Sequence, residues 1–267
     1  MPMVTLGVDL ASQAKKTAAC RIRWDGGSAD VECLRIGLDD PALLDLFGHP
    51  DTGPDKIGID APFGWPGDFV QAIQEHWNSM HWPSIDRVDV SRLRLRRTDR
   101  AVKKKVRLTP LSVSADKIAM TAMRAARLLA KVHDDGEDVD RSGETCRFVE
   151  VYPAAALKRW GLPFKSYKGK GPDKADKRDN LVCDLAKETG LNLTDKVRSG
   201  CRESDDKFDA LVAALVTRAA AIRCCEPIPD EDREHAAKEG WIALPRSDSL
   251  ARLATDSRQS RCWASGH

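Results

Sequence analysis

The chain has 267 residues, of which 42% are hydrophobic and 31% are charged, and its formal net charge is +2. This composition allows a core of ordinary size and excludes a disordered, collagenous or fibrous chain. No run approaches the roughly 18 to 20 apolar residues of a membrane span, and the N-terminus lacks the layout of a signal peptide. The eight cysteines form no C-x-x-C pair, so no zinc site is expected. The sequence therefore predicts a cytoplasmic protein that does not contact a membrane.

The first part of the chain reads as a series of strands interrupted by one helix. Strands are predicted over residues 4–10, 18–24, 31–36 and 56–61, and a short amphipathic helix over residues 41–47. Turn residues at 25–28 separate the second strand from the third, and Pro62 ends the fourth. This order indicates a β-meander followed by a helix and a further strand.

Residues 68–144 break this pattern and are interpreted as an inserted or elaborated region that contains helices and a basic stretch. The core resumes with a strand over 147–152. Helices are then predicted over residues 154–160, 178–189 and 205–223, and a last short strand over residues 240–244. We expect one α/β domain over residues 1–245 and a flexible tail, rich in Ser and Arg, over residues 246–267.

Acidic side chains stand at or near the ends of three of these strands. Asp9 and Asp60 each close a short hydrophobic strand, and Glu150 lies inside another. An unpaired carboxylate in a sheet that helices cover on both faces costs several kcal/mol. A single polar strand end needs no special reason, but three acids in one chain point to a shared role.

A further acidic group opens the predicted helix over residues 205–223. Ser204 is a good N-cap, and Asp205 and Asp206 complement the helix dipole whatever the function. Asp209 lies one turn after Asp206, past the first turn and at the edge of the apolar stripe. Capping therefore does not explain Asp209.

Acids on neighbouring strand ends, together with a pair on one helix, would form a cage of oxygen ligands. Such a cage suits Mg²⁺ or Mn²⁺ better than zinc. Two such ions about 3.5 to 4 Å apart can ionise an attacking water and stabilise the leaving oxygen at phosphorus. The sequence therefore predicts phosphoryl chemistry that depends on a metal, without a general-base histidine.

Several segments resemble an uncharacterised family, a numbered domain of unknown function, described as predicted nucleases with a ribonuclease H-like fold. The segments are GVDLAS at 7–12, GIDAPFGWP at 58–66, RRTDR at 96–100, VEVYPAA at 149–155, DDKFDALVAAL at 205–215 and EGWIALP at 239–245. The resemblance implies a mixed five-stranded sheet with helices on both faces. It also implies a two-metal acid cluster like that of Holliday-junction resolvases.

The resemblance also implies roles for particular residues. Asp9 and Asp60 would be the strand ligands, Asp206 and Asp209 the pair on the last helix, and Glu150 an additional strand acid. All five are candidate catalytic residues, and the metal is assigned to Asp9, Asp60, Glu150 and Asp209. The chain departs from ribonuclease H in two respects. Its first predicted helix offers no glutamate, and the long stretch between Asp60 and Glu150 has no counterpart in the minimal fold.

A basic segment between residues 87 and 107 carries a charge of +8, which leaves −6 on the rest of the chain. Its cations alternate with apolar residues, so that the apolar edge of the segment could pack on the protein and the basic edge could contact a phosphate backbone. A solvated face neutralised by the chain's own acids is the alternative. We assign substrate binding to Arg96, Arg97, Arg100, Lys103, Lys168 and Tyr152. Lys168 belongs to a second basic loop over 165–171, in which Tyr167 could stack on a base.

These observations predict a nuclease that acts on DNA or RNA with Mg²⁺ or Mn²⁺, and they leave a homodimer open. Two other classes of protein are alternatives. GVDLAS also resembles the first phosphate-contacting strand of sugar kinases and related ATPases, although 267 residues hardly accommodate their two lobes. The third reading is a non-catalytic nucleic-acid-binding protein on a nuclease scaffold, which the presence of all the expected acids disfavours.

Overall fold

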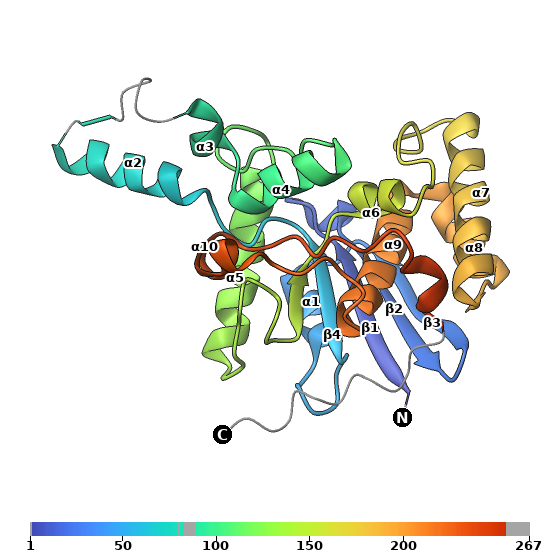
Figure 1. Ribbon diagram of the computed structural model, residues 1–267. Coiled ribbons are helices and arrows are strands. Elements are labelled where there is room, and N and C mark those ends of the chain that lie inside the picture. The colour runs from blue at the N-terminus through green and yellow to red at the C-terminus, as the bar shows by residue number, and fades with distance from the viewer. Residues whose placement is uncertain (1, 80, 83–88, 255–267) are drawn as a thin grey trace.

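A six-stranded mixed sheet forms the centre of the protein in the computed structural model, which describes residues 2–79, 81–82 and 89–254 (Figure 1). The strands are β1 (Met3–Asp9), β2 (Ala18–Asp25), β3 (Ser28–Ile36), β4 (Lys56–Asp60), β5 (Phe148–Glu150) and β6 (Leu191–Asn192). Their order across the sheet is β5-β4-β1-β2-β3-β6. The α/β class is confirmed.

The first three strands form the expected antiparallel meander, and β4 and β5 extend it in parallel to β1. The prediction of five strands is wrong, because β6 pairs in parallel with β3 at the edge of the sheet. With two residues, β6 is too short to show the alternation by which strands are recognised in a sequence.

Helices cover both faces of the sheet, as expected. One face packs against α1 (Asp40–Phe47) and α5 (Ala119–Asp134) through a cluster that includes Leu6, Phe47, Ile57 and Leu128. The opposite face packs against α9 (Asp205–Ala221), whose neighbours are α6 (Pro153–Arg159), α7 (Pro172–Thr189) and α8 (Asp195–Glu203). In the described residues, no helix is long and apolar enough to cross a membrane.

The region between β4 and β5 is helical. It holds α2 (Gly67–Ser79), α3 (Val90–Arg94) and α4 (Arg97–Val106) in addition to α5. Figure 1 shows α2 projecting from the body of the protein beside α3. Because α4 begins next to the end of β5, the basic segment lies at the carboxyl ends of the central strands.

Two expectations for the end of the chain are wrong. Residues 240–244 follow α10 (Arg233–Glu239) as an extended segment that makes only an isolated parallel bridge between Ile242 and Glu150, so they add no strand. The chain just after residue 245 is not a free tail, because Leu250 and Leu253 are buried in the core on the α9 face. The rest of the predicted tail, from residue 255, lies outside the described residues.

Two glycines let α9 lie directly on the strands. A Cβ atom added to Gly7 in β1 would lie 2.0 Å from the backbone nitrogen of Ala214 in α9. One added to Gly58 in β4 would lie 2.0 Å from the side-chain oxygen of Thr217. No other residue type fits at Gly7 without displacing the helix backbone, or at Gly58 without displacing the Thr217 side chain. These glycines precede Asp9 and Asp60 by two residues each, on the same face of the sheet.

Candidate active site at the carboxyl ends of the strands

Asp9 and Asp60 are partners in the parallel register of β1 and β4. Each is the last residue of its strand, and each shares the α9 face with the glycine two positions before it. In the part of the chain that the structure describes, neither carboxylate accepts a hydrogen bond. The two acids therefore lie side by side and lack donors that would compensate their charge.

Asp209 on α9 completes this group, which we call the acid cluster (Asp9, Asp60 and Asp209). The Asp209 carboxylate is 2% exposed and has a partner at each oxygen. The Tyr167 hydroxyl donates to Oδ1 at 2.8 Å, and the Lys168 ammonium lies 2.6 Å from Oδ2. The helix thus brings an acid distant in sequence onto the two strand ends.

The acid cluster has raised pKa values throughout. Burial and then the negative charge of Asp209 and Asp60 raise the pKa of Asp9 well above its usual range. Burial raises the pKa of Asp60 to about 7, although the charge of Lys168 opposes the shift. Burial also raises the pKa of Asp209. Without a further cation, the site holds more carboxylate charge than its surroundings stabilise.

This electrostatic arrangement predicts a pH dependence of stability in the protein kept free of metal by EDTA. Because the pKa of Asp60 is higher in the folded protein than in the unfolded chain, the folded state retains the proton between about pH 4 and pH 7. The free energy of unfolding should therefore fall as the pH rises through that window. Urea unfolding at several pH values measures the fall, and it should be smaller in Asp60→Asn. Equal slopes in the two proteins would contradict the prediction.

A loop over residues 165–171 is fixed to hold Tyr167 and Lys168 at the acid cluster. The guanidinium of Arg178, which is buried on α7, donates to the backbone oxygens of Tyr167 and Gly169 and to those of Cys201 and Arg202. The Gly169 N–H donates to Asp205 Oδ2 at 2.7 Å. The position of Lys168 is therefore set by contacts on both sides of it.

The structure corrects the expectation for Tyr167. Its side chain is 1% exposed and its hydroxyl binds Asp209, so it cannot stack on a base from solution. Tyr152, in contrast, is half-buried at the start of α6, beside the acid cluster. Burial and the charge of Asp60 raise the pKa of Tyr152 to about 12.

Glu150 does not join the acid cluster, which corrects its assignment as a metal ligand. In the register of β5 and β4, Glu150 is paired with Ile59, whose side chain lies on the α5 face, opposite Asp60. Its two carboxylate oxygens each accept at 2.7 Å from the Arg96 guanidinium, and one also accepts from the Phe63 N–H. The pleat of the strand therefore directs Glu150 into a separate, satisfied ion pair.

Arg96 is correspondingly not available to a substrate, although the sequence assigned it to substrate binding. It is 2% exposed, and besides Glu150 it donates to both carboxylate oxygens of Asp99 and to the backbone oxygen of Glu239. The Glu239 carboxylate in turn accepts from the backbone N–H groups of Gly67 and Arg97. This buried network joins the start of α2, the start of α4 and the end of β5.

The other predicted site residues lie near the surface. Arg97 is paired with Asp232 at 3.1 Å, whereas Lys103 is exposed and Arg100 is partly exposed on α4. Asp206 is partly exposed one turn before Asp209, and burial raises its pKa. Ser204 caps α9 through the Lys207 N–H, as expected. Arg87, the first cation of the basic segment, lies outside the described residues.

The described residues contain no three Asp, Glu, His or Cys side chains arranged to enclose a metal ion as they stand. Asp209 faces Lys168, and Glu150 faces Arg96. Asp9 and Asp60 nevertheless present carboxylate oxygens without donors, which are ligands that Mg²⁺ and Mn²⁺ prefer. The donor chemistry of these two aspartates therefore suits a hard divalent cation.

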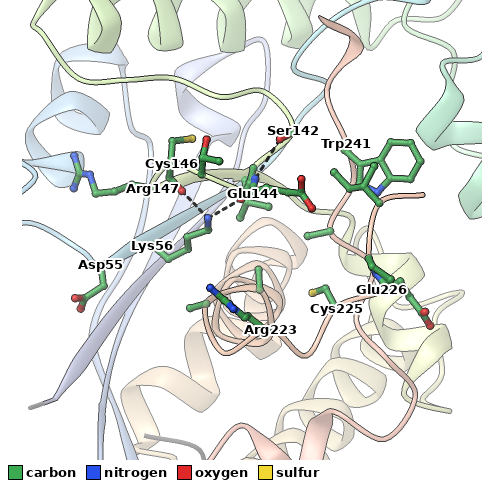
Figure 2. A pocket seen from close by; sticks show the side chains of 18 of the residues that line it. Asp55, Lys56, Ser142, Glu144, Cys146, Arg147, Arg223, Cys225, Glu226 and Trp241 are labelled. Atoms are coloured by element: carbon green, nitrogen blue, oxygen red, sulfur yellow. Dashed lines mark hydrogen bonds between the residues drawn. The ribbon is translucent and has the colours of Figure 1, made fainter. Parts of the chain in front are cut away.

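A cavity of about 990 Å³ lies at the other end of the strands (Figure 2). The starts of β1 and β4, the residues before β5 and the end of α9 line it. Figure 2 shows the Lys56 ammonium directed at backbone oxygens, those of Gly143 at 2.8 Å and Cys146 at 2.6 Å. None of the site residues predicted from the sequence borders this cavity, so it is separate from the acid cluster.

Sequence reasoning missed the residues that position the loop. The helix dipole alone accounts for Asp205 in the sequence, and Arg178 lies in a predicted helix with no motif that marks it. One signal was present, because Arg178 shares an apolar stripe of α7 with Leu181, Val182 and Leu185. A cation on a buried stripe must find several acceptors, which here are the loop carbonyls.

These elements define the protein as an α/β protein with buried acids at the carboxyl ends of adjacent parallel strands and on the helix that packs against them. The chain belongs to the family described as protein of unknown function (DUF429), which matches residues 7–234. No curated protein and no solved structure matches the chain. The match includes the whole acid cluster and the loop that holds Lys168.

Proposed function

We propose that this protein is a metal-dependent nuclease that hydrolyses phosphodiester bonds in DNA or RNA. One observation carries the proposal: two partly buried carboxylates on adjacent strand ends, Asp9 and Asp60, lack donors and face a third carboxylate on α9. A cation bound between acids placed in this way would relieve their mutual repulsion. Their oxygen ligands suit Mg²⁺ or Mn²⁺.

The topology also supports this proposal. An antiparallel meander extended by two parallel strands, with helices on both faces, agrees with what the resemblance to ribonuclease H-like nucleases implies for the core. Relative to that core, β6 is an additional strand at the edge of the sheet, and the helices α2 to α5 are inserted between β4 and β5.

Each residue has a defined part in the proposed reaction. Asp9, Asp60 and Asp209 would hold the metal, which when bound can ionise a water and stabilise the leaving oxygen at phosphorus. In hydrolysis the water oxygen bonds to phosphorus, the bond to the leaving oxygen breaks, and that oxygen ends protonated. Tyr152 and Lys168 border the acid cluster and would orient the phosphate.

Cleavage assays with labelled DNA and RNA test the proposal directly. Single-stranded, duplex and branched substrates are incubated with the full chain and Mg²⁺ or Mn²⁺, with EDTA as the control. We expect cleavage of at least one substrate class that EDTA abolishes. Cleavage that persists in EDTA, or turnover of ATP with a small-molecule acceptor in place of cleavage, would contradict the proposal.

The basic surface of α4 gives a second test, through the salt dependence of binding. Arg100, Lys103, Lys104 and Arg107 recur at helical spacing, and Lys103 and Lys104 are exposed, without acidic partners among the described residues. If both lysines contact duplex phosphates, replacing them by glutamine should flatten the slope of log K against log salt by up to about 1.8.

Binding would be measured without divalent ions to prevent cleavage. Lys177→Gln with Lys187→Gln, two exposed lysines of α7, is the matched control and should leave the slope unchanged. Equal slopes for both double variants and the wild type would assign the α4 cations to a solvated face.

A further inference from the structure

Lys168 places a positive charge at the solvent edge of the acid cluster. Its ammonium lies 2.6 Å from Asp209 Oδ2. The Lys168 side chain is 57% exposed; partial desolvation of its ammonium lowers the pKa of Lys168, but the charges of Asp209, Asp60 and Asp9 raise it by more. The ammonium therefore interacts with every member of the acid cluster.

We propose that the Lys168 ammonium takes the place of a second metal ion, so that the acid cluster holds a single divalent cation. This inference rests on the proposed function, since it specifies how that site meets its need for positive charge. It replaces the sequence-based expectation of two ions. Asp9 and Asp60 would hold the ion, and Asp209 would face both the ion and Lys168.

The charges at the site support a single ion. Glu150 is paired with Arg96, which it shares with Asp99, on the opposite face of the sheet, so three carboxylates form the acid cluster. One divalent ion and one ammonium group balance those three charges. Two ions beside the same lysine would leave an excess of two positive charges before any substrate binds. Asp205 and Asp206 also act on the cluster, but both are partly exposed at its rim, where solvent screens their charge.

The backbone around Lys168 shows that this position is built into the fold. Arg178 binds the carbonyl groups of the residues on either side of the lysine, and Asp205 accepts from the Gly169 N–H. Asp205 and Asp209 lie one turn apart on α9, so the helix that supplies the acid also anchors the loop that supplies the cation. These contacts fix the backbone on both sides of Lys168, and the ion pair with Asp209 directs its exposed side chain to the acid cluster.

A fixed ammonium could also perform what a second ion does for a phosphodiester. A lysine binds phosphate as a point charge. A cation held in advance at the place where negative charge develops stabilises it without further reorganisation. The chemical role of Lys168 would therefore be to stabilise charge on the phosphoryl group.

Counting bound Mn²⁺ tests this inference without any cleavage assay. Equilibrium dialysis gives the number of ions per chain, and electron paramagnetic resonance distinguishes an isolated Mn²⁺ from a magnetically coupled pair. We expect one isolated ion in the wild type. Lys168→Ala should bind a second Mn²⁺ and show a coupled pair, whereas Lys168→Arg, which keeps the charge, should still bind one.

Lys170→Ala is the matched control, because Lys170 is an exposed lysine of the same loop and should leave the count at one. Two ions in the wild type, or one ion with unchanged affinity in Lys168→Ala, would overturn the inference while leaving a metal-dependent nuclease intact. Absence of Mn²⁺ binding in the wild type and in Lys168→Ala would overturn both proposals. Circular dichroism verifies that each variant is folded.

Discussion

Replacing Asp60 by asparagine is expected to lower the rate of phosphodiester cleavage by more than about 100-fold, because loss even of an outer-shell partner costs 10- to 100-fold at metal sites. Asparagine keeps the shape of the side chain and removes the charge that would hold the cation. The same substitution at Asp9, its register partner, should have a similar effect. Single-turnover cleavage and Mn²⁺ affinity would be measured for both variants.

Asp55→Asn provides a matched control for this experiment. Asp55 lies just before β4, at the end remote from the acid cluster, and its carboxylate accepts from the Val4 N–H at 2.6 Å. Its substitution should leave cleavage within about threefold of the wild type, since a surface substitution of this kind changes stability only slightly. Equal activity in Asp60→Asn and the wild type would remove Asp60 from the mechanism.

Replacing Arg96 by methionine is expected to reduce the free energy of unfolding by about 3 to 5 kcal/mol. The substitution leaves the buried carboxylates of Glu150 and Asp99 without the cation that bridges them. Both have almost no exposure through which water could compensate. Urea unfolding at neutral pH measures the loss, and Arg96→Lys, which keeps one charge but not the paired contact with Glu150, should lose less.

Arg92→Met is the control for a pair of the same chemistry at the surface. Arg92 pairs with Asp68 at 2.7 Å, and both side chains are partly exposed. Exposed pairs of this kind contribute about 0 to 1 kcal/mol. A loss below about 1 kcal/mol in Arg96→Met as well would show that the network around Glu150 does not stabilise the fold.

The hydrophobic pattern of the sequence was sufficient to locate the two strands that end in Asp9 and Asp60. Both are short apolar runs, and turn residues follow them. The helical spacing also showed that Asp209 lies past the first turn of its helix, where a side chain cannot cap the helix. The sequence could not show which face of β5 carries Glu150. That face depends on the register with β4, and a shift of one residue reverses it.

The partners of the acids were beyond prediction for a different reason. Arg96 looks like any other cation of a basic run, and its partner Glu150 is 54 positions away. Tyr167 looks like a surface aromatic beside lysines, yet α9 covers it and its hydroxyl faces Asp209. In both cases the deciding contact joins segments whose proximity arises only when the helices pack on the sheet.

Gly7 and Gly58, which lie under α9, determine how far substitutions elsewhere in the core can move Asp209 relative to Asp9 and Asp60. At Gly7 the backbone of α9 packs directly on the strand, and at Gly58 the Thr217 side chain of the helix fills the contact, so α9 lies close to the strand ends that carry the acids. Substitutions among the apolar residues around this contact can alter packing without separating α9 from the strand ends. The core is therefore free to vary in sequence while the spacing of the three carboxylates stays constant. A side chain at Gly7 would lift the helix and separate the acids, and one at Gly58 would displace Thr217.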